Sequence, residues 1–206
     1  MASRMIHYTV AKLITDQVEL KNKNRFFVGS LAPDMVSYEG GRHKKRRAHF
    51  FERNEELGVK GYNWLKFYQK YLEGNIYDEF ALGYLVHLIC DSIWVTDIQV
   101  KYIYSADPET LKKNINKSYE DNKRHSYYIA KKYGMTYNIK PLRSFSVEEA
   151  NIQFQSSYLE DLKQDFLPYG DNLELEIQNL KAIVNCIEKC IITCVKEIKL
   201  VIDNKE

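Results

Sequence analysis

The chain has 206 residues, 45% of them hydrophobic, which is enough to bury one sizeable core. Its 30 Lys and Arg against 28 Asp and Glu leave a net charge of +2, so bulk charge predicts neither a nucleic-acid-binding protein nor a membrane-surface protein. No window approaches the roughly 18 apolar residues of a membrane span, and the first residues do not form a leader peptide. We therefore expect a cytoplasmic protein of one domain, residues 1–206, without a transmembrane segment, and we infer no obligate protein partner.

The apolar residues repeat at intervals of three and four, which is typical of helices. Ser3 can cap a first helix that ends near Lys21. The segment 26–49 contains Pro33 and the adjacent Gly40 and Gly41, which favour an ordered loop. Further helices are expected over residues 58–72, 78–102, 107–134, 146–166 and 173–202. The sequence predicts an all-α, multi-helix bundle with one long functional loop, and its most apolar helix, residues 78–102, lies at the centre.

A polar pair interrupts this central helix, at His87 and Asp91. Residues four apart lie one above the other on a helix, so an imidazole and a carboxylate can bind one metal ion from a single face. Their neighbours in the sequence are apolar, where an unpaired carboxylate would be costly. Either a metal ion or a hydrogen bond between the two side chains would satisfy them.

The same spacing recurs in reverse order at Asp121 and His125, again within a predicted helix. Two such pairs suggest two metal ions. Charged neighbours, Lys123 and Arg124, are equally consistent with a solvated helix face. Asp97 continues the central helix on a side compatible with Asp91, although a lone carboxylate is usually just exposed.

Three further candidates lie earlier in the chain. His7 is on the apolar face of the first helix, where a histidine is usually a satisfied core residue. Asp34 and His49 belong to the predicted loop, from which side chains can converge on a site held by rigid helices. Four of the five histidines fall in segments that also supply a carboxylate, which favours a shared metal site.

The chain resembles the zinc-dependent phospholipase C family in four ordered segments: Ser-Arg-Met-Ile-His7, Gly-Ser-Leu-Ala-Pro-Asp34, His49-Phe and Gly-Tyr-Leu-Val-His87-Leu-Ile-Cys-Asp91. Secreted zinc nucleases that cleave single-stranded nucleic acid share this fold and ligand order. The resemblance covers about residues 3–125, and it implies clustered zinc ions with Asp91 bridging two of them.

The chain also departs from that family. The family has a histidine six residues after the bridging aspartate, where this chain has Asp97, and its later His-x-x-x-Glu or His-x-x-x-Asp pair appears here as Asp121 and His125. The resemblance implies that these three residues complete a second site, and their oxygen ligands favour harder ions such as manganese. The implied cofactors are two zinc ions, or three if His7 and Asp91 hold another, although the family's N-terminal tryptophan ligand is absent near His7.

The resemblance also implies a role for Asp34 as the residue that activates water. The basic stretch 42–47 lies between two proposed ligands, and therefore near the mouth of the site. It suits a phosphate-ester substrate, which could be a phospholipid head group, a nucleotide or single-stranded nucleic acid. A solvated charged loop is the alternative interpretation.

Two hypotheses follow from these residues. The first is a metal-dependent phosphoric ester hydrolase of the phospholipase C type, with a nuclease or nucleotidase of the same fold as a variant. The second is a non-catalytic helical binding protein that keeps a structural metal site. Catalysis requires an open coordination position, whereas a structural site is enclosed by protein ligands. A histidine-aspartate phosphohydrolase is disfavoured, because the chain has no adjacent His-Asp pair.

Overall fold

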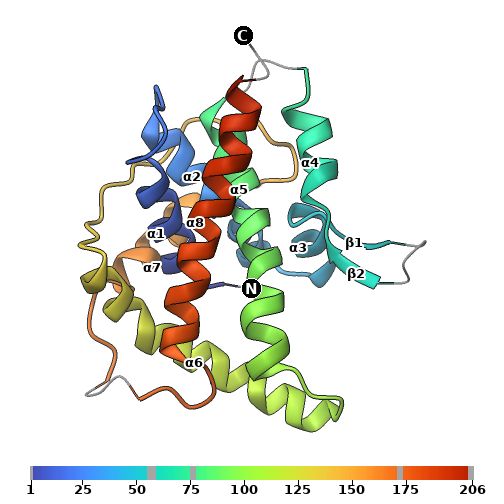
Figure 1. Ribbon diagram of the computed structural model, residues 1–206, viewed down its shortest axis with the longest axis vertical. Helices are drawn as coiled ribbons and strands as arrows, with labels where there is room; N and C mark the ends of the chain where they lie inside the picture. The colour runs from blue at the N-terminus through green and yellow to red at the C-terminus, as the bar shows by residue number, and fades with distance from the viewer. Residues whose placement is uncertain (1, 55–58, 75–77, 171–173, 204–206) are drawn as a thin grey trace.

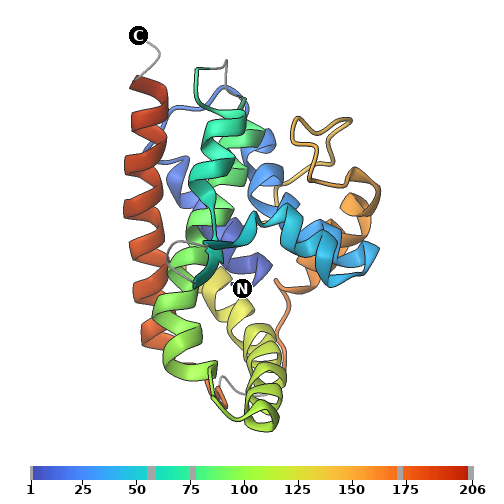
Figure 2. The same ribbon diagram turned by 90° about the vertical axis from the view of Figure 1, so that its right-hand side faces the viewer.

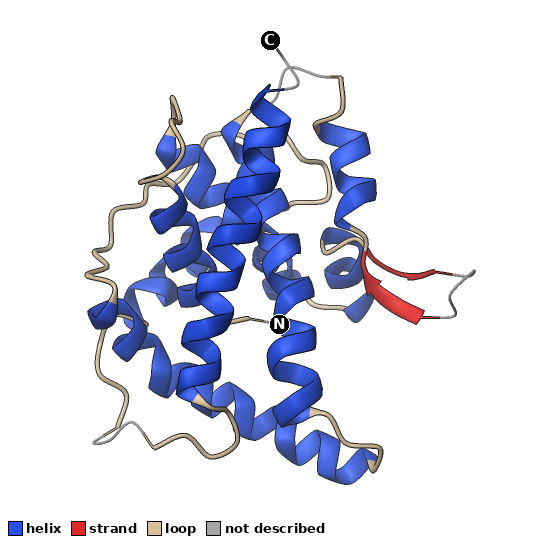
Figure 3. Cartoon of the chain, in the orientation of Figure 1, coloured by secondary structure: helices blue, strands red, loops and turns tan. Residues whose placement is uncertain are grey.

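The computed structural model describes residues 2–54, 59–74, 78–170 and 174–203, and it confirms the all-α prediction (Figures 1 and 3). In the described part of the chain, α-helices alternate with two short 3-10 helices (η1, η3), one π-helix (η2) and one hairpin. The elements in chain order are α1 (Arg4–Ile14), α2 (Lys23–Met35), η1 (Val36–Glu39), α3 (Arg42–Ala48), β1 (Phe51–Asn54), β2 (Val59–Tyr62), α4 (Trp64–Tyr71), α5 (Glu79–Trp94), η2 (Val95–Ile103), α6 (Pro108–Lys132), η3 (Ile152–Phe154), α7 (Gln155–Gln164) and α8 (Leu180–Asp203).

Helix α5 lies in the middle of the molecule and packs against α2 and α8 (Figure 1). As expected, Asp78 caps it, because its carboxylate accepts a hydrogen bond of 2.9 Å from the amide of Ala81.

The expectation that no segment is apolar enough to cross a membrane needs correction. The 25 residues Glu79–Ile103 are long and apolar enough, but 72% of the most apolar window is buried, as in a core helix.

Two glycines allow α2 and α5 to cross at backbone contact. A Cβ atom on Gly29 would lie 2.1 Å from the carbonyl oxygen of Phe80, and one on Gly83 would lie 2.1 Å from that of Phe26. No larger residue fits at either position. The predicted loop over residues 26–34 is therefore wrong: the segment is helical through Pro33, and its glycine serves close packing instead of a turn.

The basic stretch is also helical, contrary to the predicted loop. Gly40 and Gly41 adopt φ angles of 78° and 91°, and α3 begins directly after them. The hairpin that follows was not expected, because strands of four residues are too short to show an alternating pattern. Its antiparallel register pairs Phe51 with Tyr62, whose ring centroids lie 5.2 Å apart.

Helix ends follow the capping residues more closely than the apolar pattern. Asp107 caps α6 as predicted, and the helix stops just before Gly134, whose φ is 57°. Helix α1 ends at Ile14, earlier than expected, and α7 begins only at Gln155. Figure 2 shows α8 along one edge of the molecule and α3 on the opposite side.

Candidate metal centre

Five side chains named from the sequence converge in the core. His7 comes from α1, Asp34 from the last turn of α2, and His49 from the residue that ends α3, while His87 and Asp91 face the same way from α5. Four of them are at most 1% exposed, and Asp34 is 7% exposed. Their ligand atoms form two overlapping groups that share His87, and each group is compact enough to hold a metal ion.

The spacing of the ligand atoms matches zinc coordination. The Nε2 atom of His87 lies 3.2 Å from Nε2 of His49 and 3.5 Å from Oδ2 of Asp91. His49 Nε2 lies 3.4 Å from an Asp34 oxygen, and His7 Nε2 lies 3.5 Å from Oδ1 of Asp91. Two ligands bound tetrahedrally to one zinc ion at about 2.0–2.1 Å are themselves roughly 3.3 Å apart.

The two facing imidazole nitrogens have no hydrogen atom between them in the neutral state. His87 donates its Nδ1–H to the carbonyl oxygen of Ser30, and His49 donates its Nδ1–H to that of Lys45, each at 2.8 Å. The Nε2 atoms of neutral rings therefore present lone pairs to each other. A proton or a metal ion between them removes this repulsion, and an Nδ1 bond to a carbonyl is the usual support of a metal-binding histidine.

Several buried polar atoms in the cluster form no hydrogen bond with any described residue. They are both ring nitrogens of His7, Oδ1 of Asp34 and Oδ2 of Asp91. Leaving a buried polar group unpaired costs about 1–3 kcal/mol, and more if it is charged. These atoms border one another, so a shared cation would satisfy all three side chains at once.

The pKa shifts of the carboxyl groups and of His7 in the cluster favour binding of a cation. Burial raises the pKa of Asp91, but the close imidazoles of His7 and His87 outweigh burial and hold that pKa well below its ordinary value. Burial likewise disfavours the charged form of Asp34, and His49 and His87 reverse the effect, so the pKa of this carboxyl is also lowered. Burial lowers the pKa of His7, which keeps its ring neutral and able to bind a metal ion.

Three groups around the cluster were not predicted as part of it. The backbone N–H of Ala2 donates to Oδ1 of Asp91 at 3.0 Å. Tyr62, on the unpredicted hairpin, lies close to the cluster, and burial together with the charges of Asp91 and Asp34 raises its pKa. Lys45 places its ammonium 4.0 Å from Asp34. Only Lys45 carried a signal in the sequence, as part of the basic stretch.

The cluster opens to solvent at Asp34. This residue lines a pocket of about 380 Å³ together with cationic and hydroxyl side chains from α1, α3 and α6. Its wall includes Arg4, Lys45, Lys123 and Ser126. A phosphate ester entering this pocket would meet positive charge before it reached the buried ligands.

The structure does not bring Asp97 to the cluster. This residue lies in η2, and its carboxylate pairs with Lys189 of α8 at 3.0 Å and with Lys101 at 3.9 Å. Its side chain is 22% exposed. In this conformation Asp97 joins η2 to α8 and provides no ligand to the buried ions that the sequence suggested.

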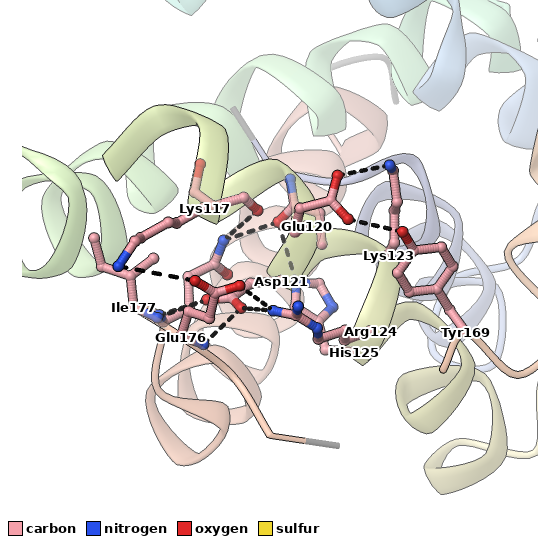
Figure 4. A network of polar contacts seen from close by, with 12 residues as sticks. Lys117, Glu120, Asp121, Lys123, Arg124, His125, Tyr169, Glu176 and Ile177 are labelled. Carbon is pink, nitrogen blue, oxygen red and sulfur yellow. Dashed lines mark hydrogen bonds and ion pairs between the residues drawn. The ribbon is translucent and has the colours of Figure 1, made fainter. Parts of the chain in front are cut away.

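The second pair, Asp121 and His125, belongs to neither ligand group, and Figure 4 shows it within a network of polar contacts. The carboxylate of Asp121 accepts backbone N–H groups from Glu176, Ile177 and Gln178 at 2.8–2.9 Å, and it pairs with Arg124 at 3.2 Å. Its oxygens are thus occupied by the segment that leads into α8. His125 is fully buried and its Nε2 contacts Asn122 of the same helix at 3.2 Å, so it is Asp121 that joins the segment before α8 to α6.

Comparisons with known proteins identify the family of the chain. No curated protein and no solved structure shows a significant match to the chain. The family described as zinc-dependent phospholipase C matches residues 6–131, which is more than half of the chain and includes every element that supplies a ligand to the cluster. The helical fold is consistent with this family, and the chain belongs to the zinc-dependent phospholipase C family.

Proposed function

We propose that the protein is a metal-dependent phosphoric ester hydrolase of the phospholipase C type. The observation that carries this proposal is the set of five buried side chains whose neighbouring ligand atoms are 3.2–3.5 Å apart and partly unpaired. His7, Asp34, His49, His87 and Asp91 would hold zinc-like ions. Such ions, when bound, supply positive charge that stabilises a phosphoryl transition state and activates water.

Side chains of the protein would accept the proton, orient the substrate and hold the ligands in place. Asp34, at the boundary between cluster and pocket, is the proposed general base, because it is a cluster carboxylate that borders the pocket and can accept a proton from a solvent molecule there. Lys45 and Arg4, which line the same pocket, would orient the anionic ester. Asp91 would hold the imidazoles of His7 and His87 in place.

A purely structural metal site is the competing function, and the pocket weighs against it. An enclosed site would have every ligand sealed from solvent. Here one ligand, Asp34, borders a pocket large enough for a phosphate group. Asp97 and Asp121, which depart from the family pattern, do not distinguish these functions. Asp97 pairs with Lys189, and Asp121 accepts backbone N–H groups from the segment before α8.

The first test is the metal content of the purified, tag-free protein, measured by elemental analysis together with hydrolysis of a soluble phosphodiester. We expect two equivalents of zinc or manganese per chain and metal-dependent turnover. Metal bound without turnover on phospholipids, nucleotides or single-stranded nucleic acid would support the structural alternative. Absence of metal uptake would contradict both functions.

Asp34→Asn separates binding from catalysis. The amide keeps one oxygen ligand but cannot take up a proton, so most of the metal should remain while kcat falls by roughly 10²–10⁴. Asp97→Asn is the matched control, because Asp97 pairs with Lys189 of α8 and lies outside the cluster and the pocket. If Asp34→Asn turns over at the wild-type rate, Asp34 is not the base.

A further inference from the structure

The four cysteines of the chain lie where α8 packs against α5, and no step of the proposed hydrolysis uses them. Cys186, Cys190 and Cys194 follow one another at intervals of four residues, so their thiols lie along one face of α8. Cys90 comes from α5, which runs beside α8 (Figure 1). All four are free thiols and at most 1% exposed.

The closest contact in this group is between thiols of the two helices. The Sγ atoms of Cys90 and Cys194 are 4.0 Å apart, and Cys194 Sγ also lies 3.9 Å from the carbonyl oxygen of Val86. An S–H group is only a weak donor, so these contacts satisfy the thiols weakly. Cys190 is close enough to Cys90 and to Cys186 for each of them to change its pKa. The four sulfur atoms therefore form a continuous row, which we call the thiol row.

Packing alone does not explain why sulfur recurs at all four positions, because other small apolar residues also fill a helix interface. Thiolate sulfur is a soft ligand, which selects ions such as zinc and Cu(I). The histidine and aspartate side chains of the buried cluster are harder ligands. The two groups of side chains therefore differ in the class of metal ion that they favour.

The arrangement of the sulfur atoms distinguishes between zinc and Cu(I). A structural zinc ion needs four ligands around one point. In the described part of the chain, the groups of three possible ligands within 4.8 Å of one another contain no cysteine. A row of thiols instead offers its sulfur atoms two at a time. Cu(I) accepts two sulfur ligands on opposite sides, so the row fits Cu(I) better than zinc.

The distance between Cys90 and Cys194 fits such an ion. Two sulfur atoms on opposite sides of one metal ion are separated by about twice the metal–sulfur bond length, or roughly 4.5 Å. The observed 4.0 Å needs only a small outward movement. Binding replaces one S–H proton on each side chain: Cu⁺ and two thiols give a bis-thiolate complex with one negative charge, and two protons pass to solvent. The two polarisable sulfur atoms share this charge.

The thiol row approaches the protein surface at its Cys186 end. Asp97 and Lys189 lie near Cys186, since both affect its pKa, and they pair with each other at 3.0 Å. Their side chains are 22% and 54% exposed. An ion entering here would pass along the row by exchanging one sulfur ligand at a time.

We propose that the thiol row is a second metal site, specific for Cu(I), which holds its first ion between Cys90 and Cys194. The inference goes beyond the proposed function and does not depend on it, because the hydrolysis involves only the histidine–aspartate cluster and its pocket. The chain then separates two classes of metal ion by ligand type, with the harder ion among histidines and aspartates and the soft ion between α5 and α8.

The test is an equilibrium titration of the full-length protein with Cu(I), without oxygen and in competition with a chromophoric Cu(I) chelator. The wild type should bind at least one ion per chain, with a rise in ultraviolet thiolate–metal absorption. Cys194→Ala should bind it more than about a hundredfold more weakly, because loss of a metal ligand's supporting partners already costs roughly 10–100-fold. Cys186→Ala is the matched control, since it removes the same side chain from the same helix, outside the closest pair.

Two further variants protect the test against a folding defect. Cys90→Ala repeats it from α5, and Cys194→Ser keeps the side-chain volume while removing the soft ligand. Both should match Cys194→Ala, with circular dichroism as the check on folding. The proposal is overturned if the wild type binds no Cu(I), or if Cys186→Ala binds it as weakly as Cys194→Ala. It is also overturned if X-ray absorption shows nitrogen ligands, or if the titrated protein contains a disulfide in place of the two thiols.

Cu(I) binding and hydrolysis fail separately. His87→Ala should lose zinc and hydrolysis but keep Cu(I) binding, whereas Cys194→Ala should keep the zinc content of the wild type. Cu(I) binding without hydrolysis of a phosphodiester would retain the thiol site and reject the proposed function. Hydrolysis without Cu(I) binding would reject the thiol site alone.

Discussion

Two regions of the molecule share one sequence pattern and have different structures. His87 with Asp91, and Asp121 with His125, each place an imidazole and a carboxylate one helical turn apart in a buried position. The first pair meets three more candidate ligands and retains unpaired polar atoms. The second meets backbone N–H groups, which satisfy its carboxylate.

Spacing on a helix therefore identifies candidate metal ligands, but the side chains and backbone groups packed against them determine whether they are available to a metal ion. α1, α2 and α3 bring other side chains with lone pairs to His87, which suits a cation. The segment before α8 brings hydrogen-bond donors to Asp121, which replace a cation. Metal should therefore matter only to the first region, and each of the following changes tests that difference.

The largest effect is expected from His87→Ala, because His87 belongs to both ligand groups. The variant should lose its metal, its hydrolysis and the stabilisation that bound metal gives to the folded state, about 4 kcal/mol at a thousandfold excess over Kd. Calorimetry with and without added zinc measures this loss. Unchanged metal content would reject the site.

The matched change in the second region is Asp121→Asn. It removes a charge that accepts three backbone N–H groups, so the free energy of unfolding should fall by about 1.5–3 kcal/mol. Metal content should remain that of the wild type, as elemental analysis can show. Loss of metal here would mean that the second pair is a ligand set after all.

A comparable effect is expected from Gly83→Ala, which tests how the first region is held together. The added Cβ would clash with the backbone of α2, so we expect a loss of about 3 kcal/mol in urea unfolding and weaker zinc binding. Gly61→Ala is the control, because a Cβ at Gly61 meets nothing within 4 Å. Equal losses in both variants would contradict the role of the helix crossing.

The smallest effect near neutral pH comes from His125, whose pKa burial lowers from 6.5 to about 4. The unfolded chain takes up a proton below pH 6.5 while the folded protein does not, so stability is complete above that pH and declines as the pH falls towards 4. The decline approaches about 3 kcal/mol. His125→Gln should have a flatter stability curve from pH 7 to 4.5 than the wild type.

The fold class and the metal-site candidates could be predicted because helical periodicity, caps and ligand spacing are local signals. Ser3, Asp78 and Asp107 cap the helices that were expected to begin there. The long loop was wrong because Pro33 lies inside α2, and because Gly40 and Gly41 only separate η1 from α3. Gly29 is a packing residue, and only its neighbour α5 reveals this.

The parts that the sequence did not predict depend on contacts between distant segments. The segment before α8, some 55 residues away, occupies Asp121, and Lys189, 92 residues away, occupies Asp97. Tyr62 comes close to the cluster through a hairpin too short to predict. The domain assignment remains a prediction.

The hydrogen bonds of His49 and His87 to the carbonyl oxygens of Lys45 and Ser30 have an evolutionary consequence. A main-chain carbonyl remains when the side chain of its residue is substituted, so both imidazoles keep the same free nitrogen while positions 30 and 45 vary. The orientation of these two imidazoles is therefore insensitive to the side chains at positions 30 and 45. Substitutions at the two positions would change the surroundings of the cluster and leave its facing nitrogens in place.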